Sequence, residues 1–328
     1  MSPEILGYLE EVRRHLRLDP VTERRVIREF SSHLEERVAE LRAGGLGERQ
    51  ASRVAIESFG RPRAIAREMY EAHSKGTWGE AALAALPHLL LAAVFVIQLW
   101  SEPLLAAIAL LSVPCVTLYG WWHGKPGWMY PWIGYSLLPL FIGGYASAPV
   151  LWQGFSFLTG GVGVFPDAWL LLIVVVFLGS SVWVVGSTAV RVVRRDWILA
   201  SLMLVPLPVV GGWLVNTTLG RGALSAEAVQ DSAVPLAVAL FSLGVTSAVF
   251  IRLRQRVLKV GALVIVGFIA TAAVGHNLWG EAVFAGLLLS ALVLLAVVLS
   301  PALVEARVGH GERRDRLFTE KAPLEQTL

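Results

Sequence analysis

From Ala81 onward, long apolar runs alternate with short polar breaks, and no other feature of the sequence constrains the fold as strongly. A helix needs about 20 apolar residues to cross the hydrocarbon core of a bilayer. The runs are continuously apolar and do not alternate residue by residue, which favours helices over a β-barrel. We therefore predict about eight membrane-spanning helices, at residues 81–100, 103–120, 128–147, 168–190, 197–215, 233–251, 260–277 and 282–304.

The loops that join these runs differ in charge, and this difference predicts their orientation. On one side of the membrane only Arg221 is basic. Loops with an excess of Lys and Arg stay in the cytoplasm. An even number of spans then puts both termini there, in a multi-pass protein of the plasma membrane. The basic residues of the opposite side are Lys125, Arg191, Arg194, Arg195, Arg252, Arg254, Arg256 and Lys259.

Charge also divides the chain into domains. Residues 1–76 hold 14 of the 28 Lys and Arg residues and 13 of the 25 Asp and Glu residues. We expect a soluble domain at 1–76, a membrane domain at 77–304 and a disordered cytoplasmic tail at 305–328. Charge is balanced within 1–76, whereas a nucleic-acid-binding surface would show an excess of basic residues, so we expect no nucleic-acid partner. The apolar runs make membrane lipid an expected partner.

Four helices are predicted within the soluble domain, which makes the whole chain all-α. Asp19 and Pro20 form a helix start, with an N-cap and a proline at the first position, and Gly44 marks the end of that helix. A third helix is expected at about 48–59, and Pro62 opens a fourth. The helical spacing of apolar residues predicts a core of Ile5, Leu9, Val12, Leu16, Ile27, Phe30, Leu34, Val38, Leu41, Ala51, Val54, Ala55, Phe59, Ile65, Met69 and Tyr70.

Three segments of this domain carry a resemblance to a known family: residues 8–12 (YLEEV), 29–36 (EFSSHLEE) and 51–62 (ASRVAIESFGRP). Together they resemble bacterial permease prefix domain 1 and the closely related HAAS (helical, signalling-associated) domain, over about residues 3–72. The family usually has an acidic residue where this chain has Arg61. The resemblance implies a domain without enzymatic activity that precedes membrane segments, some of them transporter permeases, and that is associated with PadR-like transcription regulators.

These motifs supply the candidate residues for binding a cytoplasmic protein partner. Glu29, His33 and Glu36 share one helix face, but a metal ion would need further ligands. We expect Glu29 and His33 either to form an i,i+4 pair or to help seat the next helix, and we expect no cofactor or metal. The partner-binding candidates are Glu29, Phe30, His33, Phe59, Gly60 and Pro62.

Two predicted spans contain proline close to paired glycines, in similar stretches at 137–145 and 204–213. These stretches fit either a duplicated two-helix unit or chance similarity. Broken helices at corresponding positions are typical of transporter binding sites, although small residues also serve plain helix packing. The segment 148–167 between spans is apolar for a loop, and it fits either a surface loop or a re-entrant segment. The candidate helix-break positions are Pro139, Gly143, Gly144, Pro206, Pro208, Gly211 and Gly212.

The sequence favours one function and leaves others open. The favoured hypothesis is a regulatory or signalling protein whose cytoplasmic domain contacts a protein partner. The alternatives are a transporter or permease subunit and a purely structural role. No catalytic motif occurs, and the predicted spans hold no Asp, Glu, Lys or Arg well inside the membrane, where ion-coupled transporters place them. His88 is the only interior candidate for such an ionisable group, and a packing role is expected for it.

Overall fold

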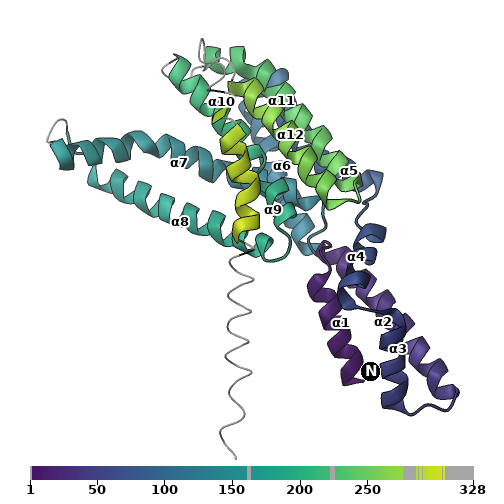
Figure 1. Ribbon diagram of the computed structural model, residues 1–328. Coiled ribbons are helices and arrows are strands. Elements are labelled where there is room, and N and C mark those ends of the chain that lie inside the picture. The colour runs from purple at the N-terminus through teal and green to yellow at the C-terminus, as the bar shows by residue number, and fades with distance from the viewer. Residues whose placement is uncertain are drawn as a thin grey trace, which may run out of the picture.

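The structure is a computed structural model that describes residues 2–160, 164–221, 226–275, 286, 288–289, 291–304 and 306. Throughout these residues the chain forms helices and no strand, so the predicted all-α class is confirmed. Figure 1 shows a small helical bundle at the N-terminus, followed by a larger assembly of long helices. The tail predicted at 305–328 lies outside the described residues, except for Ala306.

The N-terminal bundle contains α1 (Pro3–His15), α2 (Pro20–Ala43), α3 (Glu48–Phe59) and α4 (Pro62–His73). Local signals set these bounds. The Asp19 carboxylate accepts hydrogen bonds from the backbone N–H groups of Val21 and Thr22 and so caps α2. At the start of α4, Arg61 makes no such side-chain cap.

Apolar side chains from all four helices form one core in this bundle. Ile27 is partly buried and packs against this core, with its neighbour Val26 fully buried. One predicted core position is wrong, because Val54 is 37% exposed. It lies one residue from the buried Ala55, which is the error expected when a helix face is read from periodicity alone. The buried core is Ile5, Tyr8, Leu9, Val12, Leu16, Leu18, Val26, Phe30, Leu34, Ala55, Ala66 and Tyr70.

Seven segments in the described part of the chain are long and apolar enough to cross a membrane. They correspond to the first seven predicted spans. Much of the eighth, at 282–304, lies outside the described residues, and Ala291–Val304 is a shorter apolar helix. A 3₁₀ turn, η1 (Leu99–Ser101), joins the first two spans. The long helices are α5 (Trp78–Val96), α6 (Pro103–Trp122), α7 (Met129–Gly160), α8 (Ala168–Val193), α9 (Trp197–Leu204) with α10 (Pro206–Arg221), α11 (Ala226–Arg252) and α12 (Arg256–Gly275).

Helix α7 is longer than predicted. It includes residues 148–160, which the sequence placed in a surface loop or a re-entrant segment. It also continues without a break through Pro139, Gly143 and Gly144, so these positions are not helix breaks. A proline can remain inside a membrane helix when neighbouring groups satisfy the freed backbone carbonyl. At about 1.5 Å per residue, α7 exceeds the roughly 30 Å hydrocarbon core.

The fifth span, Trp197–Thr218, is divided at proline: α9 ends at Leu204 and α10 begins at Pro206, while Val205 between them keeps helical backbone angles. Proline lacks the N–H that would continue the helix ladder. By contrast, α10 continues through Pro208, Gly211 and Gly212. Gly211 provides room for a ring from α7: a Cβ there would lie 3.2 Å from Phe141. That contact is helix packing of the kind that small residues permit in membranes.

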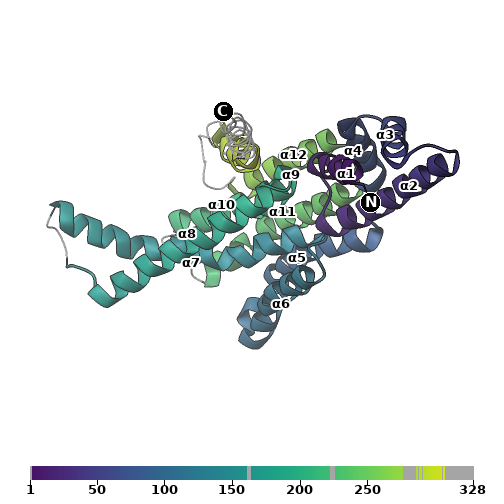
Figure 2. The ribbon, with the colours of Figure 1, turned by 90° about the horizontal axis from the view of Figure 1, so that it is seen from below.

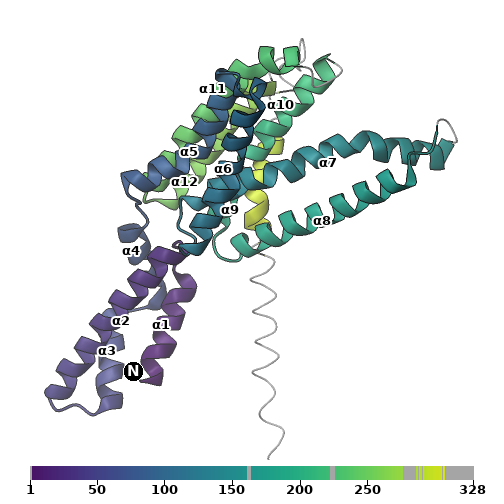
Figure 3. The same ribbon diagram turned by 180° about the vertical axis from the view of Figure 1, so that it is seen from behind.

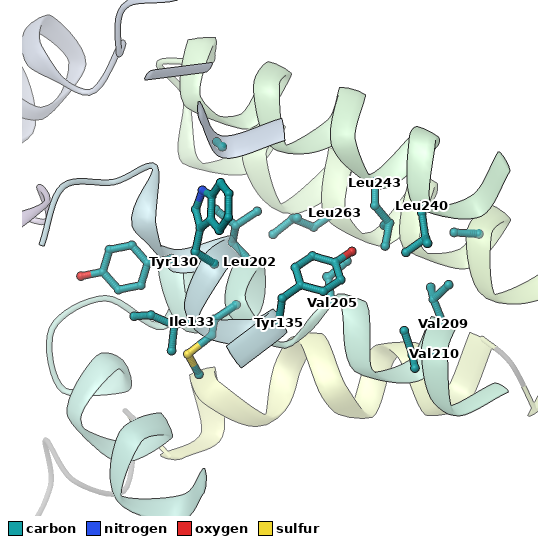
Figure 4. Close-up of a cluster of buried hydrophobic side chains, with 14 of the residues drawn as sticks. Tyr130, Ile133, Tyr135, Leu202, Val205, Val209, Val210, Leu240, Leu243 and Leu263 are labelled. Atoms are coloured by element: carbon teal, nitrogen blue, oxygen red, sulfur yellow. The ribbon is translucent and has the colours of Figure 1, made fainter. Parts of the chain in front are cut away.

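Short helix α9 lies at the centre of the membrane domain, where most of its residues are buried. Leu202 and Val205 pack in one apolar cluster with Leu240 and Leu243 of α11 and Leu263 of α12, as Figure 4 shows. The helices α7 and α8 run together away from α10, α11 and α12 in all three ribbon views (Figures 1, 2 and 3). The apolar cluster around Leu202 and Val205 thus forms the core of the membrane domain, on the side close to the N-terminal bundle.

Candidate functional site

The N-terminal bundle meets the membrane helices through a layer of charged side chains. Glu23 in the first turn of α2 is 7% exposed. Its carboxylate accepts a hydrogen bond from Arg13 Nε at 2.9 Å and another from Arg195 Nη2 at 2.8 Å. Arg195 belongs to the turn between α8 and α9, and its carbonyl oxygen accepts a hydrogen bond from Arg17. One buried carboxylate thus joins the bundle to the membrane domain.

A second buried carboxylate, Asp196, lies next to this contact and is 3% exposed. It binds Arg256 at the start of α12 through two donors, at 2.7 and 3.3 Å. Its Oδ1 also accepts the backbone N–H of Ile198 at 3.1 Å and so caps α9. The Arg256 guanidinium lies 5.4 Å from the centre of the Tyr70 ring. Asp196 therefore links α9 and α12 directly beneath α4.

The linker between α4 and α5 is bonded to the end of α11. The Gly76 N–H donates to the Ile251 carbonyl oxygen at 2.9 Å. Arg252 Nη1 donates to the Gly76 carbonyl oxygen at 2.8 Å. The Ser74 hydroxyl donates to the Arg254 carbonyl oxygen at 3.1 Å. One backbone and two side-chain hydrogen bonds therefore hold the linker in a defined path.

The contacts of Glu23, Asp196 and Gly76 together form the joint between the N-terminal bundle and the membrane helices. A pocket of about 140 Å³ lies within this joint. Burial raises the pKa of Asp19 above its usual value, although hydrogen bonds from Thr22 and Val21 oppose the shift. Burial also raises the pKa of Tyr70 to about 12. The walls of this pocket carry charged groups from the N-terminal bundle and from the membrane helices, so the pocket lies at the interface between them. The lining residues include Asp19, Tyr70, Gly76, Glu80, Asp196 and Lys259.

The joint departs from the sequence-based expectations for several basic residues. Arg256 and Lys259 belong to α12 and not to a loop, and Lys259 is only 6% exposed. Its ammonium lies 4.9 Å from the centre of the Phe250 ring. The sequence analysis did not identify Glu23 and Asp196 as the ion-pair partners of Arg195 and Arg256. Each acidic residue adjoins a pair of arginines in the sequence, but its ion-pair partners lie elsewhere in the chain.

Three of the partner-binding candidates have structural roles inside the bundle. Phe30 is 6% exposed and packs edge-on against Phe59, with ring centres 5.2 Å apart. Gly60 has a φ of 97°, a backbone conformation that favours glycine. Its carbonyl oxygen accepts a hydrogen bond from the Tyr8 hydroxyl at 3.0 Å. Phe30 is therefore not available to a partner.

The polar candidates are on the surface. Glu29 and His33 are both exposed on α2. His33 Nδ1 lies 3.5 Å from a carboxylate oxygen of Glu36, one turn further along. His33 thus contacts Glu36 at i,i+3, and the expected i,i+4 pair with Glu29 is not formed. Pro62 occupies the first turn of α4, as its residue type predicts.

His88 lies on α5 inside the membrane domain and is 1% exposed. Its Nε2 is 3.3 Å from the Ser247 hydroxyl oxygen on α11. Its ring meets Tyr135 edge-on, with ring centres 5.0 Å apart. His88 therefore connects α5, α7 and α11 by packing and one hydrogen bond.

Comparison with known proteins identifies the N-terminal bundle. Residues 7–68 match the HAAS family. The chain therefore carries a HAAS domain, followed by seven long apolar helices that indicate a multi-span membrane region. No curated protein and no solved structure matches the chain.

Proposed function

We propose that this integral membrane protein is a regulatory protein whose HAAS domain docks a cytoplasmic protein partner. In this proposal the membrane domain holds the docking domain at the cytoplasmic face, and the chain is not an enzyme. The observation that carries the proposal is the joint at Glu23 and Asp196. At that joint the Glu23–Arg195 ion pair fixes one end of the HAAS domain to the membrane helices, while the other end projects away from them in Figure 3.

The projecting end offers a charged surface to a partner. Glu29 and His33 lie on the outer side of α2, and Arg37 continues that exposed surface. Exposed charges steer association and select partners more than they strengthen binding. The family resemblance suggests a PadR-like transcription regulator as the class of partner. The basic ends of the spans support a cytoplasmic location for this domain and for both termini.

A transporter or permease subunit is the second candidate, and the interrupted span at Pro206 favours it. Discontinuous helices often line substrate sites in transporters. Here the interruption lies in an apolar cluster, where Val205 and Val209 are at most 2% exposed. Apolar side chains fill the space beside the break, which favours the docking function over transport.

Site-specific photo-cross-linking in cells tests the docking proposal with the full-length chain. A photoreactive amino acid replaces His33, and a matched variant carries it at Glu68, an exposed position on α4. We expect a soluble transcription regulator to be captured from position 33 and not from position 68. Mass spectrometry identifies the captured protein. Capture of a transport ATPase would favour the permease function, and equal capture from both positions would contradict docking through α2.

A further inference from the structure

Four basic side chains line a second pocket, where α6 and α7 meet the end of α8. The pocket has a volume of about 370 Å³, and none of its described lining residues is acidic. It adjoins the HAAS domain, because Arg195 contacts both the pocket and Glu23. The residues used below are Trp121, Lys125, Tyr130, Arg191, Arg194 and Arg195.

The positive charges in this pocket are poorly neutralised by the protein. Among the residues that the structure describes, Lys125, Arg191 and Arg194 form no ion pair with a carboxylate. Arg191 donates only to the carbonyl and hydroxyl oxygens of Ser187. Desolvation lowers the pKa of Lys125, and the charges of Arg195 and Arg191 lower it further. A bound anion would relieve this mutual repulsion.

Arg195 provides a second observation that points to a ligand, because one of its hydrogen-bond donors has no acceptor in the described part of the protein. Its Nη2 binds Glu23, but its Nε is buried and has no hydrogen-bond partner. Buried donors in native proteins are nearly always paired, because an unpaired one loses its bond to water without replacement. A phosphate presents several strong acceptor oxygens, and guanidinium groups bind it in a geometrically matched way.

The surroundings of the pocket fit a lipid. Lys125 Nζ lies 3.8 Å from the centre of the Trp121 ring, and tryptophan favours the level of lipid headgroups. Further along α6 and α8, Leu118 and Val182 are exposed apolar side chains. A ligand here can therefore place a charged head among the cations and acyl chains along the helices. Basic pockets between membrane helices bind headgroups of anionic lipids in this way.

We propose that the pocket lined by Lys125, Arg191, Arg194 and Arg195 binds the phosphate headgroup of an anionic phospholipid. The site is separate from the partner-docking surface on α2, and it requires only that the helices lie in a membrane. A headgroup bound there lies beside the Glu23–Arg195 pair that seats the HAAS domain.

Native mass spectrometry of the full-length protein tests the proposal, with phosphatidylglycerol and phosphatidylcholine as probes. We expect the wild-type protein to bind phosphatidylglycerol in preference to phosphatidylcholine. Arg194→Gln should weaken phosphatidylglycerol binding about fivefold, the effect of one basic group near an anionic surface. The double variant Lys125→Gln with Arg191→Gln should weaken it further. Arg194→Lys keeps the charge and should restore most of the binding.

Arg254→Gln is the matched control, because Arg254 is an exposed residue near the same helix ends that does not line the pocket. It should leave phosphatidylglycerol binding unchanged. Equal losses in Arg194→Gln and Arg254→Gln would overturn the proposal, because the attraction would then be a general property of the basic surface. Size-exclusion chromatography of each variant separates loss of the site from loss of the fold.

A second arm separates a lipid from a soluble phosphate compound. Inorganic phosphate and glycerol 3-phosphate are titrated against the protein in phosphatidylcholine nanodiscs, and thermal stability is recorded. We expect neither to stabilise the protein at concentrations where phosphatidylglycerol does. If glycerol 3-phosphate binds as tightly as phosphatidylglycerol and displaces it, the acyl chains contribute nothing and the lipid proposal fails.

Discussion

Two buried carboxylates determine how distant parts of this chain meet. An ionised carboxylate is costly to bury unless it is paired and hydrogen-bonded. Glu23 meets that requirement with Arg13 and Arg195, and Asp196 meets it with Arg256. Each ion pair can form only when the two segments that carry its residues pack in this arrangement. The Glu23 pairs therefore specify how the HAAS domain sits on the membrane helices, and the Asp196 pair specifies how α9 and α12 meet.

Asp19 provides a test of burial at a single residue. Its folded-state pKa is raised above 3.8 because burial disfavours the charged form. The folded chain then holds the proton more tightly than the unfolded chain, so stability falls as the pH rises from about 4 through the raised pKa. Asparagine caps helices as well as aspartate does. We therefore expect Asp19→Asn to raise the melting temperature at pH 7 and to give no gain below pH 4.

Differential scanning fluorimetry in detergent between pH 4 and 8 measures this effect. The exposed variant Glu29→Gln is the control, with an expected change within about 0.5 kcal/mol. A lower melting temperature for Asp19→Asn at pH 7 than for the wild-type protein would show that the ionised carboxylate stabilises the joint.

At the scale of elements, the linker between α4 and α5 packs its backbone closely against the end of α11. Gly76 lies against the end of α11, where its N–H reaches the Ile251 carbonyl oxygen. A Cβ at Gly76 would overlap the Ile251 side chain. Thr77 then caps α5 in a reciprocal arrangement with Glu80, which fixes the direction of the first span. The linker thus orients the HAAS domain and α5 relative to each other.

Substitution of Gly76 by alanine should loosen this linker. We expect a loss of about 1–3 kcal/mol, typical of an added group in a packed site, and faster tryptic cleavage at Lys75. Gly79→Ala is the matched control, because a Cβ there meets only the Thr77 hydroxyl at 3.9 Å. Limited proteolysis of the full-length protein measures both variants. Identical cleavage rates for the two variants would mean that the linker accommodates the added methyl group.

At the scale of the whole molecule, the HAAS domain projects from the membrane helices, as Figure 2 also shows. The membrane domain has an apolar centre. Leu202, Leu240 and Leu263 are each 1% exposed or less in that centre. The charged groups lie at the helix ends and at the joint. This division keeps charge out of the apolar centre, and both the Glu23–Arg195 pair and the basic side chains of the second pocket lie on the side that carries the HAAS domain.

Removing the charge of Glu23 should free the HAAS domain from its fixed orientation. Glu23→Gln loses the ion pairs with Arg13 and Arg195 and leaves two arginines without their carboxylate. We expect a broad range of distances between spin labels at positions 33 and 254 in double electron–electron resonance, against a narrow range in the parent protein. Cys115 is replaced by alanine in both samples. Glu29→Gln is the control, and equally narrow distributions in all samples would contradict this role of Glu23.

The bounds of α1 to α4 were determined by the sequence itself, because helix signals act within a few residues. Asp19, Pro20, Gly60 and Pro62 mark starts and ends through their own backbone preferences. The apolar runs likewise predicted the first seven spans, since bilayer thickness sets their length. The HAAS resemblance followed from short motifs that lie within these helices.

Only the tertiary structure decided which charged residues are buried. Glu23 and Arg195 lie 172 positions apart, and nothing near either residue indicates the other. The basic residue Lys259 looks solvent-exposed in sequence, but another segment covers it. Phe30 was both a predicted core residue and a partner-binding candidate, and its burial decides for the core. Local conformation depends on neighbours along the chain, whereas the burial of a charge depends on the distant segment that removes it from water.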